Sequence, residues 1–386
     1  MAQTGASPAS ISHDAHEAVL KWLAGEPTDE RIHLIVLFGG ESAEHDVSCT
    51  TAAHVLAAAD ANRYRITPIG ISTDGTWALA DAAAAALKSG DLLPGQLEPA
   101  GSTVSPTALL SAATRSPGRT VVMPLLHGPM GEDGTVQGLL ELANVPYVGA
   151  GVLASAVAMD KAMAKQVTTA AGIPQAEYRA FAEHEIGPGL AAELASELGL
   201  PAFVKPANMG SSVGVSKATT VDELSDAINL ALAYDETIVV EEGVVGKEIE
   251  VAVLGNAKPK AATPGEIVPG AEFYSYEDKY VDEGSYALIP APIGDAALAE
   301  AKGLAVRAYR AMRCEGLSRV DFFWEDPNEG GRGLLLNEIN TMPGFTPISM
   351  FPKMWIADGV SYPEIIDQLV DLALDRHIRK RRNTTH

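Results

Sequence analysis

Leu317-Ser-Arg-Val-Asp-Phe-Phe-Trp324 and Gly333-Leu-Leu-Leu-Asn-Glu-Ile-Asn340 are two apolar runs that a short polar linker separates. The linker, Asp326-Pro-Asn-Glu-Gly-Gly-Arg-Gly333, is rich in residues that form turns. Apolar runs of this length on either side of such a turn are typical of a β-hairpin. We therefore expect an antiparallel hairpin whose centre lies between Glu329 and Gly330.

Four polar side chains fall on one face of this hairpin. Side chains alternate along a strand, so residues two apart, such as Arg319 and Asp321, share a face. In the expected register Asp321 lies opposite Glu338, and Asn340, two residues further on, lies opposite Arg319. Three oxygen-bearing side chains suit Mg²⁺ that holds nucleotide phosphates, and a guanidinium suits an oxyanion. The alternative is a solvated strand face that carries ordinary charges.

The composition indicates a globular protein of a reducing compartment. At 386 residues, with 47% hydrophobic and 20% charged residues, the chain is long enough for two or three domains. Its two cysteines, Cys49 and Cys314, give no disulfide framework. A net charge of −22 argues against a general nucleic-acid binder, and the basic end Arg379–Arg382 is interpreted as a solvated tail. We expect a cytoplasmic protein, because no apolar run has the length of a membrane span and no signal peptide is recognisable.

Strands and helices alternate in the first part of the chain, and glycines follow several strands. This pattern predicts an open α/β domain over residues 31–152 that binds ligands at the carboxyl edge of its sheet. Residues 1–30 are polar and are expected to form a flexible extension. Two α+β units are expected to follow, over residues 153–241 and 242–380. Within the last unit, residues 265–287 show little periodicity and predict a long functional loop.

Apolar periodicity and the breaks at glycine and proline predict the individual elements. The expected strands are residues 32–38, 66–71, 120–126, 146–149, 202–205, 215–217, 237–241 and 248–254. The expected helices are residues 16–23, 47–59, 134–143, 159–171, 221–234, 296–312 and 362–379. Residues 72–118 are expected to contain helix and loop without defined edges.

A segment rich in glycine and serine follows one of the expected strands. This segment, Lys205-Pro-Ala-Asn-Met-Gly-Ser-Ser-Val-Gly214, offers backbone N–H groups, two hydroxyls and a lysine, which together suit a phosphate. It is not a P-loop, because the Gly-Lys-Ser/Thr spacing is absent. The alternative is a glycine-rich hairpin turn.

Three further segments place polar side chains at expected strand ends. In His127-Gly-Pro-Met-Gly-Glu132 the acid could orient the histidine, and the alternative is a turn with capping acids. Glu44 could pair with a substrate ammonium, and the alternative is a helix N-cap. The linker Val239-Val-Glu-Glu-Gly-Val244 suits an adenine site in which carbonyls and an acid read the base and ribose. Exposed acids at a hinge are the alternative there.

Together these segments resemble the D-alanine–D-alanine ligases of the ATP-grasp superfamily, from about Ile32 to Val370. The resemblance implies an ATP-grasp fold, in which an open parallel α/β domain precedes two α+β domains that sandwich ATP. The motifs that carry it, in the family order, are Gly39-Gly-Glu-Ser-Ala-Glu44, His127-Gly-Pro-Met-Gly-Glu-Asp-Gly134, Met159-Asp-Lys161, Lys205-Pro with Gly210-Ser-Ser-Val-Gly214, Glu272-Phe-Tyr with Lys279-Tyr280, Arg319-Val-Asp321, and Glu338-Ile-Asn-Thr-Met-Pro-Gly344.

The resemblance also implies a role for each matching residue. ATP would contact Lys161, Lys205, Ser212, Glu241, Glu242, Val244, Glu248 and Lys279. Two Mg²⁺ ions, which Mn²⁺ can replace, would bind Asp321, Glu338 and Asn340, and K⁺ is a further candidate cation. The catalytic residues would be Glu44, Ser211, Tyr280 and Arg319, and the D-alanine sites would include His127, Gly344, Ser349 and Met350. Some relatives carry lysine at the position of Glu242, so its backbone is expected to read the base.

These roles imply an enzyme that joins two D-alanine molecules through an acylphosphate and releases ADP and phosphate, for peptidoglycan synthesis. A cytoplasmic homodimer is expected, with no nucleic-acid or membrane partner. Tyr280 favours a dipeptide product, because relatives that form depsipeptides have a different loop with a histidine. The alternatives are a D-alanine–D-lactate or D-serine ligase, an ATP-grasp ligase for another carboxylate, and an inactive nucleotide-binding or scaffolding protein.

Overall fold

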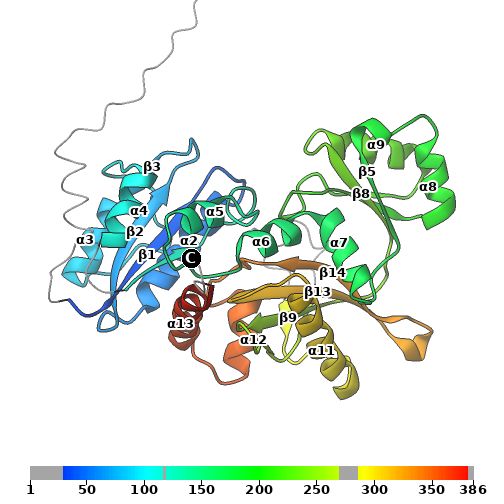
Figure 1. Ribbon diagram of the computed structural model, residues 1–386. Coiled ribbons are helices and arrows are strands. Elements are labelled where there is room, and N and C mark those ends of the chain that lie inside the picture. Colours follow the sequence, from blue (N-terminus) through cyan, green and yellow to red (C-terminus); the bar gives the residue numbers. More distant parts are fainter. Residues whose placement is uncertain (1–28, 116–118, 269–285, 381–386) are drawn as a thin grey trace, which may run out of the picture.

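The computed structural model describes residues 29–115, 119–268 and 286–380, which form three β-sheets with helices around them (Figure 1). The first sheet is mostly parallel and the other two are antiparallel, which confirms the predicted α/β class with α+β parts. The expected extension over residues 1–30 lies outside the described residues, apart from its last two. None of the helices in the described part is long and apolar enough to cross a membrane.

The first sheet is built on strands that are covered on both faces. β1 (Ile32–Gly39) is buried along its whole length and pairs in parallel with β2 (Tyr64–Ile71) and β4 (Thr120–Pro124). β3 (Trp77–Leu79) pairs antiparallel with β2 at the edge, so the sheet is not purely parallel as expected. The helices of this region are α2 (His45–Ala58), α3 (Asp81–Ser89), α4 (Pro106–Arg115) and α5 (Thr135–Leu142).

The second sheet is antiparallel, and helices cover one of its faces. Its strands, in spatial order, are β5 (Tyr178–Ala182), β8 (Thr237–Glu242), β6 (Ala202–Pro206) and β7 (Ser216–Ala218), and its helices are α8 (Leu190–Leu198) and α9 (Val221–Leu232). Val204 and Val240 pack with both helices in one core cluster. Because side chains alternate along a strand, the next residues, Lys205 and Glu241, point to the opposite face.

The third sheet carries the hairpin. Its path is β12 (Tyr286–Leu288), β11 (Gly265–Val268), β9 (Lys247–Leu254), β13 (Leu317–Glu325) and β14 (Gly333–Asn340), and β10 (Lys260–Ala261) also pairs with β9. Along β9, Ile249 and Val251 pack with α11 (Asp295–Ala311) in a second core cluster. Glu250 therefore points to the other face of the sheet, together with the polar residues of the hairpin.

The expected long loop over residues 265–287 begins and ends in strands. β11 and β12 pair antiparallel, so the prediction of irregular structure is wrong at both ends. This pairing joins segments that are distant in the sequence, and a local pattern does not indicate it. Residues 269–285, which include the expected site residues Lys279 and Tyr280, lie outside the described residues.

The β13–β14 hairpin has the predicted register at the end that carries the charges. Asp321 pairs with Glu338, which confirms the prediction. Arg319 pairs with Asn340, as the same count requires. All four side chains line one cavity, which is the result expected for a shared face. A register slip of one residue would have placed Arg319 and Asp321 on the opposite face of the sheet from Glu338 and Asn340.

The hairpin is not symmetric, because one extra residue interrupts it. The pairing shifts between Asp321 and Phe322, and Phe322 pairs with Leu336. Asn337 is therefore left over on β14 as a β-bulge. The predicted centre, between Glu329 and Gly330, assumed uniform pairing; the pairs nearer the turn are centred on Glu329 instead. The bulge also lets Asn337 and Glu338, although adjacent in the sequence, both line the same cavity.

The helix expected over residues 159–171 is confirmed over residues 161–170, and a second helix that was not predicted precedes it. α6 (Val152–Met159) ends at Asp160, whose backbone is extended, and α7 (Lys161–Ala170) begins directly after it. Asp160 accepts a hydrogen bond from the Met163 backbone N–H at 2.9 Å and so caps α7. The cap was not recognised in the sequence because the apolar pattern continues across it.

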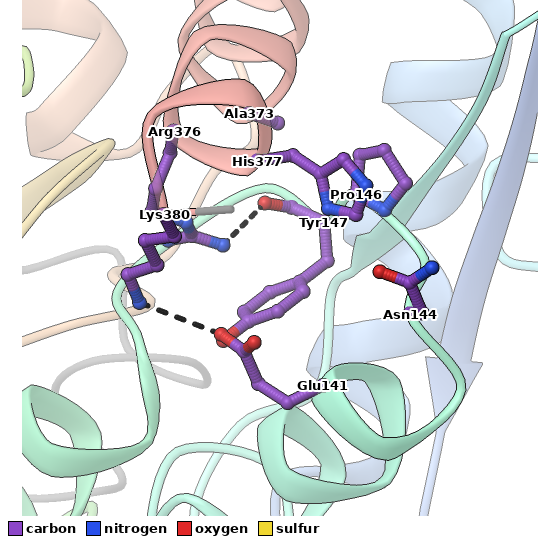
Figure 2. A pocket seen from close by; sticks show the side chains of 8 residues that line it. All are labelled: Glu141, Asn144, Pro146, Tyr147, Ala373, Arg376, His377 and Lys380. Atoms are coloured by element: carbon purple, nitrogen blue, oxygen red, sulfur yellow. Dashed lines mark hydrogen bonds and ion pairs between the residues drawn. The ribbon is translucent and has the colours of Figure 1, made fainter. Parts of the chain in front are cut away.

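The C-terminal helix α13 (Tyr362–Lys380) contacts the segment that follows the first sheet (Figure 2). Its buried Arg376 donates to the carbonyl oxygen of Tyr147 at 2.7 Å and lies 4.1 Å from the centre of the Tyr147 ring. Lys380 pairs with Glu141 at 3.4 Å. These residues also line a small cavity of about 280 Å³. The contacts fix the first sheet to the C-terminal part of the chain.

His33 on β1 predicts a pH dependence of stability. Its side chain is buried, with Nε2 2.7 Å from Thr67 Oγ1, and burial lowers its pKa to about 3 from an ordinary 6.5. Between these pH values the unfolded chain binds one more proton, so this stability is complete above pH 6.5 and is lost as the pH falls. We expect His33→Gln to reduce the slope of unfolding free energy against pH by about 1.4 kcal/mol per unit between pH 4 and 6. Urea denaturation measures it, and equal slopes would contradict the prediction.

Candidate active site

A cavity of about 1190 Å³ lies where the three sheets meet. Its walls come from the start of α2, the segment after β4, the start of α7, and the facing sides of the second and third sheets. Every expected site residue that the structure describes lines it. These residues are Glu44, His127, Lys161, Lys205, Ser211, Ser212, Glu241, Glu242, Val244, Glu248, Arg319, Asp321, Glu338, Asn340, Gly344, Ser349 and Met350.

Arg319 is held between two carboxylates in the wall of this cavity. Its Nε and Nη2 donate to the two oxygens of Asp321 at 2.8 and 2.7 Å. Its Nε also lies 3.2 Å from Glu250 Oε2, because Glu250 is opposite Asp321 across the β9–β13 pair. Burial lowers the pKa of Arg319, but these carboxylates outweigh burial and raise it well above its ordinary value. The guanidinium is therefore a fixed cation.

The hairpin residues expected to bind Mg²⁺ lie close together. Asn340 Nδ2 donates to Asp321 Oδ2 at 2.9 Å and to Glu338 Oε1 at 3.3 Å. In the described part of the chain, no three His, Cys, Asp or Glu side chains are grouped to hold a metal ion. Asp321, Glu338 and Asn340 offer two carboxylates and one amide. Their oxygens are hard donors that fit Mg²⁺ when phosphate or water oxygens complete the coordination. With Glu250, this group has three carboxylates. The single positive charge of Arg319 does not balance their three negative charges.

Two side chains from the segment after β4 hold the backbone beyond β14. His127 Nδ1 donates to the Met342 carbonyl oxygen at 3.0 Å, and the Met342 N–H donates to Glu132 Oε2 at 3.2 Å. Glu132 Oε1 accepts from the Gly128 N–H at 2.8 Å. Burial raises the pKa of Glu132 to about 8, and the nearby Glu44 adds to this effect. Glu132, expected to orient the histidine, thus binds the same residue, Met342, and ties the first sheet to the third.

Loss of this link is expected to destabilise the fold. Glu132→Leu leaves the N–H groups of Gly128 and Met342 without their acceptors, each at a cost of about 1–3 kcal/mol. We expect the free energy of unfolding to fall by about 2–4 kcal/mol, and Glu132→Gln, which keeps one acceptor oxygen, to lose about half of that. Urea denaturation measures both. The exposed Glu300→Leu serves as control, and an equally small effect of all three would refute the link.

Glu44 lies at the N-cap position of α2, but its carboxylate turns into the cavity. A Cβ at Gly210 would lie 3.0 Å from Glu44 Oε2, so the glycine- and serine-rich segment comes close to Glu44 at this residue. Ser211 and Ser212, which follow, both have positive φ, at 48° and 60°. Non-glycine residues in this region are strained, and such strain is common in ligand-binding loops. This segment and the start of α2 thus face each other across the cavity.

Comparison with known proteins identifies the family. The family model described as D-ala D-ala ligase C-terminus matches residues 167–371, and the N-terminus model of the same ligases matches residues 33–150. The chain belongs to the D-alanine–D-alanine ligase family. The D-alanine–D-alanine ligase of Bacillus pumilus is 45% identical over 358 residues, which cover 91% of this chain and 98% of that protein. Ligase A of Escherichia coli is 42% identical over 360 residues, with coverage of 90% and 97%.

Solved structures of the family have the same fold. The D-alanine–D-alanine ligase of Coxiella burnetii aligns with a TM-score of 0.76 and 36% identity over 92% of this chain and 97% of its own. The VanG D-Ala:D-Ser ligase of Enterococcus faecalis aligns with a TM-score of 0.73 and 33% identity, covering 89% and 99%. The ligase of Bacillus anthracis, solved in complex with ATP, aligns with a TM-score of 0.69 and 25% identity, covering 90% and 99%.

The side chain of Glu242, whose backbone is the part expected to read the base, makes two contacts within the protein. Glu242 Oε1 accepts from the Glu177 backbone N–H at 2.9 Å and from Arg332 Nη1 at 2.5 Å. Arg332 comes from the end of the hairpin linker, so this ion pair joins the second sheet to the third. Both contacts use Oε1, so this oxygen of Glu242 is already engaged within the protein.

Ser349 and Met350, which the resemblance assigns to the second D-alanine site, lie at the start of α12 (Met350–Ala357). Ser349 Oγ accepts from the Thr346 backbone N–H at 3.2 Å and lies 2.8 Å from Thr346 Oγ1. These two contacts close a short turn after Gly344. Gly344, whose N–H is the backbone group expected to face an oxyanion, lies two residues before this turn.

Sequence reasoning missed Glu250 and Asn337, which line the cavity, and Lys165, which contacts Glu241 from outside it. Glu250 had a usable signal, because alternation along β9 places it on the polar face. Asn337, which accepts a hydrogen bond from Lys205 Nζ at 3.2 Å, had none, because the bulge breaks the alternation. Lys165, one helical turn after Lys161, contacts Glu241 at 3.1 Å and could have been proposed from that spacing.

Proposed function

We propose that this protein joins two D-alanine molecules into D-alanyl-D-alanine and converts ATP to ADP and phosphate. The observation that carries the proposal is the single cavity where the three sheets meet. It gathers every described residue to which the family motifs assign a role. We also propose that the chain is organised as units over residues 31–152, 153–241 and 242–380, and that it acts as a cytoplasmic homodimer in peptidoglycan precursor synthesis.

The first step activates a carboxylate. One carboxylate oxygen of the first D-alanine attacks the γ-phosphorus of ATP; an O–P bond forms and the bond to ADP breaks. Lys161 and Lys205 line the side of the cavity expected to hold the phosphates and would offset their charge. Asp321, Glu338 and Asn340 would hold Mg²⁺, which supplies positive charge against the transferring phosphoryl group. Glu44 would pair with the ammonium of this D-alanine.

The second step forms the peptide bond. The amine of the second D-alanine attacks the acyl carbon, and phosphate leaves as the tetrahedral intermediate collapses. Arg319 and the Gly344 N–H would stabilise the oxyanion, and Ser349 and Met350 would shape the pocket for the second D-alanine. Water must be excluded while the acylphosphate exists, because hydrolysis competes with the amine.

The identity of the second substrate has a specific rival. The VanG structure, at 33% identity, is that of a D-Ala:D-Ser ligase, so the fold also accommodates other second substrates. We expect D-alanine to be preferred over D-serine and D-lactate between pH 6 and 9. Competition assays with product analysis by mass spectrometry decide this point. Dominant incorporation of D-serine or D-lactate at neutral pH would replace the dipeptide proposal.

A phosphate-release assay tests the proposed reaction. Purified protein with ATP and Mg²⁺ is expected to release phosphate only when D-alanine is added, with one dipeptide formed per phosphate. Release with another carboxylate but not with D-alanine would indicate a different ATP-grasp ligase. Binding of ATP without ADP formation, across a panel of D-amino acids, would indicate an inactive nucleotide-binding protein. L-alanine serves as the control substrate.

A further inference from the structure

Two lysines share one buried carboxylate in the second sheet. Glu241 Oε1 lies 3.1 Å from Lys165 Nζ, and Glu241 Oε2 accepts a hydrogen bond from Lys205 Nζ at 3.0 Å. The side chains of Glu241 and Lys165 are each 4% exposed, whereas that of Lys205 is 13% exposed. Lys205 also donates to Asn337 at 3.2 Å. With both lysines protonated, they and the one carboxylate carry a net charge of +1; burial lowers the pKa of Lys165, and the charge of Glu241 opposes this shift.

The two lysines approach Glu241 from different sides. Lys205, on β6, lines the active-site cavity together with Glu241. Lys165, on α7, is not among the described residues that line it, and its Nζ lies 5.3 Å from the centre of the Tyr178 ring. Lys161, one turn earlier on α7, does line the cavity. Lys165 therefore contacts the carboxylate from behind the cavity wall.

Burial makes the number of cations beside Glu241 important. Burial alone would raise the pKa of Glu241, but Lys165 and Lys205 lower it to about 2, so the carboxylate is ionised. A buried charge that loses its only partner is strongly destabilised. With Lys165 present, Lys205 can turn toward an anion while Glu241 keeps one cation. Without Lys165, Glu241 would compete with that anion for Lys205.

We propose that Lys165 is a positioning residue for the nucleotide: it keeps a cation beside Glu241 and so frees Lys205 to bind a phosphate. The inference rests on the nucleotide site proposed above and adds a residue that acts through Glu241 from outside the cavity. Lys165 contacts neither the substrates nor the reacting atoms in this arrangement. Its effect is therefore expected in nucleotide affinity more than in the chemical steps.

Calorimetric titration of the full chain with Mg²⁺–ADP tests the proposal. Lys165→Met keeps the apolar stem and removes the cation, and it is expected to raise the Kd for ADP at least about tenfold, because Lys205 stays on Glu241. The KM for ATP should rise in parallel, with a smaller change in kcat. Lys165→Arg should restore affinity. Made in a Glu241→Gln background, Lys165→Met should cause no further loss, because the competing anion is gone.

The controls separate the possible failures. Lys217→Met, an exposed lysine on β7, should leave the Kd unchanged. No ADP binding by the unaltered protein would count against the proposed function, before any variant is compared. Unchanged affinity in a folded Lys165→Met variant, or a further tenfold loss when Lys165→Met is added to Glu241→Gln, would overturn the inference. If Lys165→Met does not fold, the double variant is compared with Glu241→Gln alone. The proposal requires equal affinities there, and a further loss would refute it.

Discussion

Replacing Glu338 by glutamine is expected to lower kcat roughly a thousandfold, because the proposed Mg²⁺ ligand then contributes no charge against the transferring phosphoryl group. Stability is expected to change little or to rise. Glu338, Asp321 and Glu250 lie on one face of the third sheet with a single guanidinium between them, so removing one carboxylate relieves repulsion. Steady-state ADP release gives kcat, and thermal unfolding without ligands gives the stability.

A matched control lies on the same hairpin. Glu329→Gln makes the same chemical change at an exposed turn residue and is expected to leave both quantities unchanged. Equal losses of turnover and of stability in the Glu338 variant would identify Glu338 as a structural acid. A thousandfold loss of turnover with an unaltered melting temperature would support its place among the metal ligands.

Replacing Arg319 by lysine is expected to lower dipeptide formation about 10²–10³-fold, the usual effect of losing one oxyanion donor. Lysine keeps the charge but not the planar fork that holds both oxygens of Asp321 and also reaches Glu250. If Arg319 acts mainly on the second step, acylphosphate will form and then be lost to water. The ratio of ADP to dipeptide should therefore rise above one.

Rapid-quench measurement of ADP and dipeptide in the same samples gives this ratio. Arg310→Lys, an exposed arginine on α11, is the control and is expected to keep one ADP per dipeptide. An Arg319→Lys variant that slows both products equally, with the ratio still at one, would contradict a role in the second step. It would place Arg319 instead in the support of Asp321.

Local sequence patterns were sufficient for much of the fold. The apolar run of β1 and the alternation in β13 and β14 predicted these strands, and counting across the linker gave the pairing of Asp321 with Glu338. The bulge at Asn337 could not be predicted, because it depends on how β14 fits both β13 and its other neighbours. The pairing of β11 with β12 was missed for a similar reason, since it joins segments that are far apart in the sequence.

The same distinction holds for the site. Glu44, Lys205 and the hairpin residues lie in recognisable motifs, and the structure gathers them around one cavity. Glu132 lies in a motif, but its bond to the Met342 N–H arises only when the first and third sheets meet. Lys165 has no motif of its own, because its importance comes from sharing Glu241 with a lysine on another element.

The bulge in β14 divides the hairpin into a part near the turn and a part that carries the acids. The strands of the two parts pair in registers that differ by one residue. The position of Asp321 is set by its neighbours on both sides, Glu250 on β9 and Glu338 on β14. The turn at Pro327–Glu329 is exposed, and the shift at Asn337 lies between it and these acids. The turn is therefore a suitable point for inserting a fluorophore or an affinity tag. A probe there would report on the hairpin without displacing the carboxylates.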